Sequence, residues 1–392
     1  MNETLEALMA ATSVMWPAPA EVEFASGRER RFRSGGRLVR EFLVLPSARS
    51  PRLVVPAETS GAGREALRRS SQDLTTARRL ARAVLSVGFP VVRRTFPDRL
   101  RVTTPADTRR DSVDALDTHL SELLGHEVLV SFGVGSPRAN RKPVLQVHRA
   151  DGETVGFAKL GTTPVTRELV RGEAAALAAY WSVDPPAVRL EVPRVLHAGT
   201  WRDVELLLLS PLRPRSRRPE RRTDVPVDAM HELATRWGTT RRALAETPFW
   251  KAIREIPALE PVASAVEARY GHTVLPFGAW HGDWTPWNMS WDGDRVLLWD
   301  FERFATGVPL GLDAAHHRFQ TALRRHGESG AAALVTGAAD DDPTTLVYLC
   351  ELGRRWVLAS TPPEGEPLRR RTAWLLSLLA DVRQRVLGRA DP

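Results

Sequence analysis

The sequence predicts an α+β protein with two lobes, a strand-rich part followed by a helical part. Up to about residue 212, short apolar runs alternate with polar turns at the spacing of paired strands. From residue 214 onward, the apolar residues recur mostly at the spacing of helices. The chain has 392 residues, whereas a single hydrophobic core stops growing at roughly 250–300 residues. The length and the change of pattern together indicate more than one domain.

Three segments are predicted along the chain. Residues 1–109 form a small additional α+β unit with no assigned role, and this unit closes at the polar break PADTRRD. Residues 110–211 form the strand-rich lobe, and residues 212–392 form the helical lobe. The two lobes meet near residues 210–213, where we expect a hinge and a cleft.

In the N-terminal unit, apolar runs next to turn residues predict strands over 37–46, 52–57 and 99–104. Residues 63–89 predict one amphipathic helix, because their apolar side chains recur at helical spacing.

The strand-rich lobe is predicted to contain a helix, a strand, a β-hairpin, a longer helix and two further strands, over residues 112–125, 127–135, 142–161, 164–181, 193–199 and 204–212 in turn. Asp151 and Gly152 are expected to form the turn of the hairpin, since this dipeptide is a strong hairpin signal. Thr163 is expected to cap the longer helix, with Pro164 at its first position.

The composition excludes several classes of protein. The net charge of +8 suggests nucleic-acid binding, but the arginines are spread along the chain and only three of the 55 basic residues are lysine, a bias typical of codon composition. We therefore expect no nucleic-acid partner. Cys350 is the only cysteine, which excludes an internal disulfide framework and a multi-cysteine zinc site.

The sequence shows no segment typical of membrane insertion. The N-terminal residues lack a basic segment followed by a long apolar run, so no signal peptide is expected. The longest aliphatic run, VELLLLSPL, is too short to span a bilayer. The expected location is the cytoplasm, and the oligomeric state stays undefined.

Residues 279–304 combine five of the chain's 12 tryptophans with several acidic side chains. Burying an unpaired carboxylate is costly, so this mixture indicates acids held in a sheltered site. A hairpin around residues 292–294 would bring Asn288 within about one position of Asp300, and oxygen ligands at one point are what Mg²⁺ prefers. Asp283 precedes the hairpin and is expected to reach the same cavity.

Lys159 and Glu173 are the second candidate pair. Lys159 lies on one face of a predicted strand with Val155 and Phe157, and a lysine on an inward face needs an anion. In the following helix Glu173 falls on the apolar stripe, whereas Glu168 points elsewhere. We therefore predict an ion pair between Lys159 and Glu173.

Upstream of this strand, Gly133 and Gly135 would allow a backbone to approach a phosphate closely, although an ordinary turn has the same composition. The hinge residues Ser210 and Leu212 are included as candidate nucleotide-binding residues. The chain contains no G-x-x-x-x-G-K-[ST] loop and no complete dinucleotide fingerprint.

The order of these features is that of kinases: glycine loop, strand lysine, helix glutamate, hinge, and an Asp–Asn loop before a second aspartate. Over about residues 110–392 the chain resembles the aminoglycoside phosphotransferase / choline kinase superfamily, which has a protein-kinase-like fold. The motifs that carry the resemblance are HGDWTPWN, which matches H-G-D-x-x-x-x-N, and WDFE, which matches the following D-x-[DEG] segment.

The resemblance implies specific roles. Asp283 and His281 are the candidate catalytic residues, with Asp283 as the catalytic aspartate, and Asn288 and Asp300 would bind magnesium. Lys159 would contact the phosphates of ATP. The resemblance further implies that Asp313 supports the catalytic loop. Trp280, Trp287 and Trp299 are expected to wall the loop and the hairpin, and Trp284, in the variable part of the motif, is the tryptophan that could instead face the acceptor.

The expected activity is therefore an ATP- and Mg²⁺-dependent transfer of the γ-phosphate to a hydroxyl of a small molecule such as an aminoglycoside, amino sugar or amino alcohol. The alternatives are a kinase acting on a peptide or protein side chain, a non-catalytic nucleotide-binding pseudokinase, and a metal-dependent phosphoesterase that also uses His316 or His317. If the basic run over residues 213–222 lines the cleft, it disfavours a polycationic acceptor.

Overall fold

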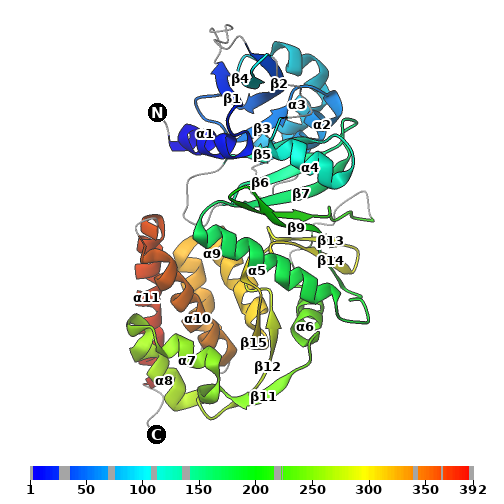
Figure 1. The fold of residues 1–392 in the computed structure, drawn as a ribbon. Coiled ribbons are helices and arrows are strands. Elements are labelled where there is room, and N and C mark those ends of the chain that lie inside the picture. Colours follow the sequence, from blue (N-terminus) through cyan, green and yellow to red (C-terminus); the bar gives the residue numbers. More distant parts are fainter. Residues whose placement is uncertain are drawn as a thin grey trace. The chain divides into compact units, whose positions relative to one another are not determined.

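The computed structural model of the chain describes residues 3–25, 36–68, 76–106, 113–134, 142–215, 222, 224–338, 343–362 and 365–387. It contains two compact units (Figure 1). The sheet unit consists of Met1–Ala174 and Arg194–Pro211, and the helical unit consists of Ala175–Pro193 and Leu212–Pro392. The predicted α+β class, with a strand-rich part and a helical part, is confirmed.

The described part of the sheet unit contains a nine-stranded sheet with the order β1-β4-β2-β3-β5-β6-β7-β10-β9. Every neighbouring pair is antiparallel. The strands are β1 Glu21–Ala25, β2 Arg37–Leu45, β3 Leu53–Pro56, β4 Arg99–Thr104, β5 Leu129–Gly133, β6 Val144–His148, β7 Thr154–Gly161, β9 Val195–Trp201 and β10 Val204–Leu209. Because β3 pairs with β5, one sheet includes strands from both sides of residue 109, and the predicted boundary there stays a prediction.

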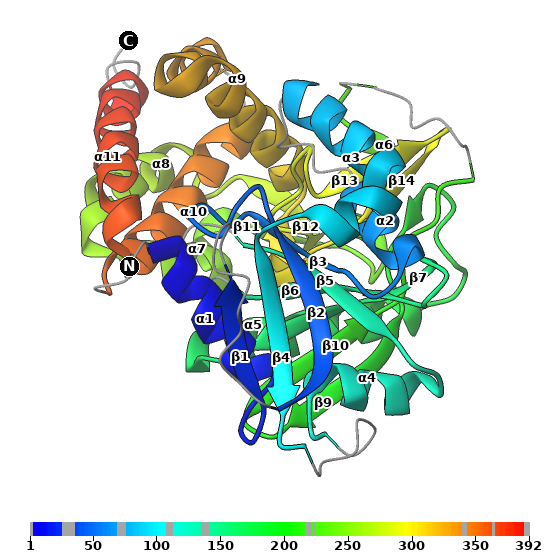
Figure 2. The same cartoon turned by 90° about the horizontal axis from the view of Figure 1, so that it is seen from above.

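Helices cover both faces of this sheet (Figure 2). On one face, Phe42 and Val44 pack with helices α1 (Glu3–Met15) and α4 (Leu116–Leu124). On the other face, Leu43 and Leu45 pack with α2 (Ser60–Arg68) and α3 (Thr76–Thr95). Alternate residues of β2 therefore belong to two separate cores, as the two-residue period of a strand requires.

The prediction of one helix over 63–89 is wrong. A single straight helix would place its two ends about 39 Å apart, at 1.5 Å per residue. Instead α2 and α3 pack against each other, and a Cβ atom added to Gly63 would lie 2.0 Å from the ring of Phe89. The pairing buries Leu67 and Phe89 in the same core, which one straight helix cannot do. Residues 69–75 lie outside the described residues.

The predicted hairpin and the helix after it are confirmed. Strands β6 and β7 pair around a turn in which Gly152 has φ 103°, a conformation that favours glycine. Helix α5 (Pro164–Trp181) follows, and the Thr163 hydroxyl accepts a hydrogen bond from the backbone N–H of Thr166 at 3.2 Å. This is the N-cap contact that the sequence predicts.

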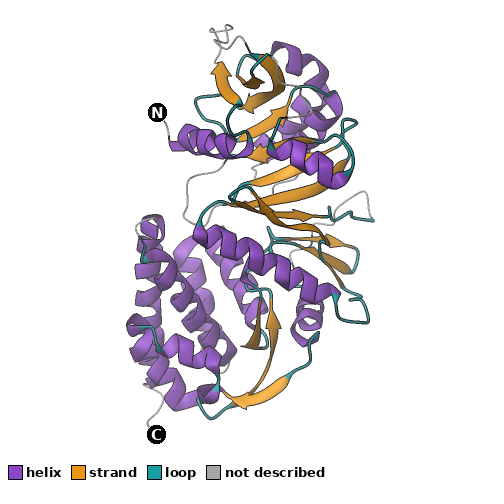
Figure 3. Cartoon of the chain, in the orientation of Figure 1, coloured by secondary structure: helices purple, strands orange, loops and turns teal. Residues whose placement is uncertain are grey.

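Helices make up most of the helical unit, as Figure 3 shows. They are α6 Val227–Thr235, α7 Pro248–Arg254, α8 Glu260–Tyr270, α9 Leu312–Ala338, α10 Pro343–Ser360 and α11 Glu366–Leu387. The unit also has two small sheets, with orders β11-β12-β15 and β13-β14-β8. Their strands are β8 Leu190–Glu191, β11 Thr240–Ala243, β12 Val274–Trp280, β13 Met289–Asp292, β14 Arg295–Leu298 and β15 Ala305–Pro309.

The core of the helical unit is formed by side chains of α7 to α11 together with β12. Within the described ranges, no helix is both long and apolar enough to cross a bilayer.

Candidate active site

The loop between β12 and β13 is held by a carboxylate from a helix. Asp313, in the first turn of α9, accepts hydrogen bonds from the backbone N–H groups of His281 at 2.7 Å and Gly282 at 3.0 Å. Gly282 has φ 81°, and a Cβ atom there would lie 2.3 Å from the carbonyl oxygen of Arg303. The loop therefore requires glycine at this position. Burial raises the pKa of Asp313 to about 7, although the two N–H groups favour its charged form.

His281 is fully buried inside the loop. Its Nδ1 accepts a hydrogen bond from the backbone N–H of Asp283 at 3.2 Å, and its Nε2 lies 3.1 Å from the carbonyl oxygen of Trp299. These contacts assign the proton to Nε2. Burial lowers the pKa of His281 to about 4, so the ring is neutral at neutral pH. The residue connects the start of the loop to the strand that leads to Asp300.

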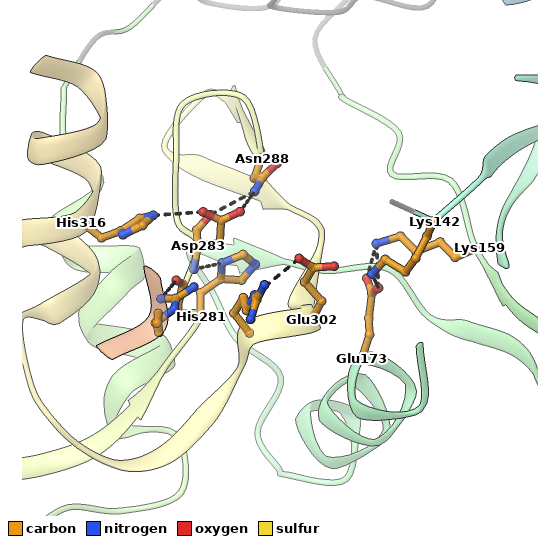
Figure 4. A network of polar contacts seen from close by, with 11 residues as sticks. Lys142, Lys159, Glu173, His281, Asp283, Asn288, Glu302 and His316 are labelled. Atoms are coloured by element: carbon orange, nitrogen blue, oxygen red, sulfur yellow. Dashed lines mark hydrogen bonds and ion pairs between the residues drawn. The ribbon is translucent and has the colours of Figure 1, made fainter. Parts of the chain in front are cut away.

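Asp283 is the part of this loop that solvent reaches, since 31% of its side chain is exposed. Its Oδ1 lies 3.0 Å from Nε2 of His316, and its Oδ2 accepts a hydrogen bond from Nδ2 of Asn288 at 2.9 Å (Figure 4). Burial alone would raise the pKa of Asp283. The hydrogen bond from His316, with a further contribution from the charge of Arg355, outweighs burial and lowers the pKa below its ordinary value. The carboxylate is therefore charged at neutral pH.

His316 reaches Asp283 from α9, and it is almost completely buried. Burial lowers the pKa of its ring, although Asp283 opposes this. The hydroxyl of Tyr348, from α10, lies 3.1 Å from Nδ1. A neutral ring that donates through Nε2 to Asp283 and accepts from Tyr348 satisfies both contacts. The ring is thus fixed in one orientation by two helices.

The hairpin brings the backbone of Asn288 opposite Trp299, one position from Asp300, as the sequence predicts. Met289 pairs with Leu298 in the hairpin, and the backbone N–H of Trp299 donates to the carbonyl oxygen of Asn288 at 3.0 Å. Asp300 follows with φ 75° and ψ 57°, a left-handed conformation that is costly for a residue other than glycine. Residues in strained backbone conformations are found mainly at active sites and binding sites, where the conformation fixes the direction of a side chain.

The donor set of this pair fits a magnesium ion. Within the described residues, both side-chain hydrogen bonds of Asn288 use Nδ2, which leaves its Oδ1 for a cation. Asp300 adds a carboxylate, and hard cations such as Mg²⁺ take oxygen ligands. Across the described parts of the chain, no group of three or more histidine, cysteine, aspartate or glutamate residues is arranged to hold a metal ion. The phosphate oxygens of a bound nucleotide are ligands that a magnesium ion would share with this pair.

In the sheet unit, Lys159 and Glu173 form the predicted ion pair (Figure 4). The ammonium nitrogen of Lys159, on β7, lies 2.6 and 2.7 Å from the two carboxylate oxygens of Glu173, on α5. Glu173 is fully buried, whereas Glu168 is exposed, so the predicted phase of the helix is confirmed. A second lysine, Lys142, lies 3.9 Å from the same carboxylate and is also buried.

Several residues were missed by the sequence analysis as parts of these sites: Lys142, Tyr348 and Arg355 were not considered, and His316 was considered only for another activity. One signal was available for Lys142. The chain has three lysines among 55 basic residues, and two of the three contact Glu173. A lysine retained among so many arginines indicates a position that needs a compact cation.

Other predicted residues lie as follows. Gly133 ends β5, and Gly135 lies outside the described residues. The backbone N–H of Arg194 donates to the hydroxyl of Ser210, at the end of the sheet unit, and Leu212 begins a segment of the helical unit. Within the basic run 213–222, residues 216–221 lie outside the described residues.

The expectation that Trp284 faces the acceptor is wrong. Its side chain is fully buried, and its Nε1 donates a hydrogen bond to the sulfur of Met289 at 3.3 Å. The indole fills the interior of the loop, because a residue at this point is enclosed between the loop and the hairpin that follows it. Trp280 instead lines a cavity.

Comparison with known proteins finds similarity in solved structures only, since no family model and no curated protein matches the sequence. The chain is similar to a thermostable mutant of aminoglycoside phosphotransferase APH(4)-Ia in ternary complex with ADP and hygromycin B, with 13% identity and a TM-score of 0.47 over 71% of this chain and 99% of that chain. It is also similar to the ADP-bound aminoglycoside phosphotransferase APH(2'')-Ib, with 12% identity and a TM-score of 0.37 over 68% and 97% of the two chains.

A third similar structure is a candidate fructosamine-3-kinase from Haemophilus somnus 129PT. Its identity is 12% and its TM-score is 0.39, over 69% of this chain and 96% of that chain.

Proposed function

We propose that this protein is an ATP-dependent phosphotransferase that moves the γ-phosphate to a hydroxyl group of a small molecule. One observation supports this above the others. A partly exposed carboxylate, Asp283, is kept charged by His316 and is fixed by Asn288, in a loop whose sequence is H-G-D-x-x-x-x-N. A fixed anion beside an oxygen-donor pair suits phosphoryl transfer to an alcohol, in which the hydroxyl must be oriented and finally deprotonated.

The low pKa of Asp283 defines its role in the reaction. A carboxylate that binds protons weakly is a poor base for the resting hydroxyl, so Asp283 first accepts a hydrogen bond and aligns the acceptor oxygen. In a loose transition state the hydroxyl becomes more acidic only as the new bond forms. Asp283 therefore takes the proton late in the step.

Magnesium would be held by Asn288 and Asp300. When bound, the ion supplies positive charge to the phosphate oxygens of the nucleotide. Lys159 is assigned to the α- and β-phosphates, and Glu173 keeps its ammonium group in a defined position. We assign His281 a positioning role, because its buried ring contacts only backbone groups by hydrogen bonds.

The test is ATP consumption by the full chain in the presence of candidate acceptors, which include sugars, amino sugars, amino alcohols and Ser/Thr peptides. The variant Asp283→Asn should retain nucleotide binding and lose turnover by about 10²- to 10⁴-fold, as expected for a positioned base. Excess chelator should abolish wild-type turnover.

The matched control is Asp294→Asn, in the exposed turn of the β13–β14 hairpin, which should behave as wild type. If Asp283→Asn keeps more than about a tenth of the wild-type rate, Asp283 does not have the proposed role.

A further inference from the structure

The helical unit contains a cavity of about 500 Å³ that the candidate active site does not use. Its walls come from β11, β12, β15, α7 and α10, together with the 3₁₀ turn after Asp300. The charged residues that line it are Arg242, Arg303, Arg354, Arg355 and Glu351. Four guanidinium groups and one carboxylate line the cavity, and Arg303 also lies 3.6 Å from the carboxylate of Glu302. The lining itself is net positive.

The single carboxylate is already paired. Glu351 is buried and accepts two hydrogen bonds from Arg354, at 2.7 and 2.9 Å, so this pair neutralises itself. Arg242 and Arg355 form no ion pair with any carboxylate of the described residues. Burial lowers the pKa of the Arg355 guanidinium, and the charge of Arg303 adds to this, while Glu351 and Asp283 oppose it. An anion in the cavity would act in the same direction as these carboxylates.

The cavity adjoins the loop that carries Asp283. Arg355 donates a hydrogen bond to the carbonyl oxygen of Gly282 at 2.6 Å, and the backbone of Arg303 lies against Gly282. Trp280, which also lines the cavity, is the last residue of β12 before the loop. A molecule bound here therefore contacts residues that flank and hold the loop that carries Asp283.

The uncharged residues that line the cavity indicate what the rest of the ligand is like. The rings of Phe249, Phe277 and Trp280 line the cavity beside the arginines, and the guanidinium carbon of Arg355 lies 5.4 Å from the centre of the Trp280 ring. Thr240 of β11 and Thr306 of β15 add threonine side chains, as does Thr247, whose hydroxyl caps the start of α7. Rings beside arginines suit a small organic anion, whose carbon body packs on the rings while its charged end meets the guanidinium groups.

We propose that this cavity binds the anionic group, a carboxylate or a phosphate, of the acceptor molecule. The identification of the bound anion as the acceptor rests on the proposed phosphotransferase function. The existence of the anion site does not depend on that function. It specifies the substrate class as an organic acid or a phosphate ester that also carries a hydroxyl, and it disfavours polycationic acceptors.

The first experiment measures binding without nucleotide, so it does not depend on the proposed function. Ligand-induced shifts in melting temperature are measured for the full chain with benzoate and with benzamide, which match in size and differ in charge. Inorganic phosphate is compared with chloride at equal ionic strength. Benzoate and phosphate should stabilise the wild type more than their controls do. Arg303→Gln and Arg242→Gln should each reduce that shift.

Arg241→Gln is the matched control, because Arg241 is exposed on the same strand as Arg242 and does not line the cavity. Its variant should bind both anions as the wild type does. Equal binding of benzoate and benzamide, or equal shifts in the wild type and in both cavity variants, would overturn the anion site.

The second experiment tests the acceptor with a series that shares one sugar body: glucosamine, glucose, glucuronate and glucose 6-phosphate. We expect kcat/KM to be higher for the two anionic members, and Arg303→Gln to raise their KM by about 10- to 100-fold, as loss of a charged hydrogen bond implies. Turnover of glucosamine alone, unchanged in Arg303→Gln, would keep the phosphotransferase and overturn the proposal. Anion binding without phosphate transfer to any member of the series would support the anion site and would contradict the assignment of these anions as acceptors.

Discussion

At the scale of single residues, the site depends on how Asp283 is kept charged. Its carboxylate is partly exposed, and it receives one hydrogen bond from a histidine and another from an amide. The histidine is itself neutral and held by Tyr348, so it contributes a directed N–H group rather than a full positive charge. His316 is therefore a positioning residue, and its removal should affect the rate more than the binding of substrates.

We predict that His316→Ala lowers kcat by about 10- to 100-fold with little change in KM, because a hydrogen bond to a charged group is worth roughly 1.5–3 kcal/mol. The pKa of Asp283 should rise, so the acid limb of the kcat–pH profile should move to higher pH. His316→Gln, which restores an N–H donor, should recover part of the loss. Identical acid limbs in wild type and His316→Ala would contradict this role.

At the scale of elements, local patterns predicted well what local forces determine. The β13–β14 hairpin, which joins Asn288 to Asp300, and the phase of α5, which buries Glu173, were predicted correctly because turns and periodicity depend on neighbouring residues. His316 and Arg355 were not predicted as site residues. They lie 33 and 73 residues from the loop groups that they contact, and only the packing of α9 and α10 brings them there.

Strand β7 and helix α5 are joined by a buried ion pair, in which two lysines, Lys159 and Lys142, lie near one carboxylate, that of Glu173. Removing Glu173 leaves two buried lysines near each other, whereas removing Lys159 leaves Glu173 with Lys142 at 3.9 Å. We predict that Glu173→Ala destabilises the protein by about 3–5 kcal/mol and that Lys159→Ala costs less. Each should weaken the use of ATP, and the double variant should be scarcely worse than Lys159→Ala, since residues in one network are not additive.

The measurements for this pair are urea unfolding and kcat/KM for ATP over the four-variant cycle. Glu168→Ala, on the exposed side of α5, is the control and should be nearly silent in both. Simple addition of the two single losses would mean that Lys159 and Glu173 do not act as a unit.

The catalytic loop and the turn of the β13–β14 hairpin offer a matched pair of glycines. Gly282 and Gly293 both have positive φ, at 81° and 64°, but only Gly282 has backbone atoms close to the position of a Cβ. We predict that Gly293→Ala costs about 1 kcal/mol, from conformational strain alone, and leaves turnover intact. Gly282→Ala should cost more and abolish turnover, because the added carbon displaces Arg303. Equal losses of stability, measured by urea unfolding, would show that the close approach does not matter.

At the scale of the whole molecule, each unit has its own core, and each unit has buried histidine. His281, His316 and His317 are buried in the helical unit, and His148 is buried in the sheet unit. Burial lowers the pKa of the three histidines of the helical unit. Each therefore stays neutral in the folded protein at a pH at which the unfolded chain binds a proton, so acid should destabilise the helical unit through these groups.

His317 allows this to be tested without touching the catalytic loop. Burial lowers its pKa to about 4, from an ordinary value of 6.5. Between pH 6.5 and 4 the unfolded chain binds a proton at this position and the folded chain does not, so stability falls as the pH is lowered through this window and is independent of this group above it. The full difference is about 3 kcal/mol.

We expect the melting temperature of the wild type to fall steadily from pH 6.5 to 4, with His281 contributing in the same direction. His317→Gln should flatten this fall, whatever its effect on stability at pH 7, because the comparison concerns the slope. His326→Gln, exposed on the same helix, should leave the slope unchanged. If the His317 and His326 variants show the same slope as the wild type, His317 does not titrate in this window, and the acid sensitivity of the helical unit arises from His281 or from other groups.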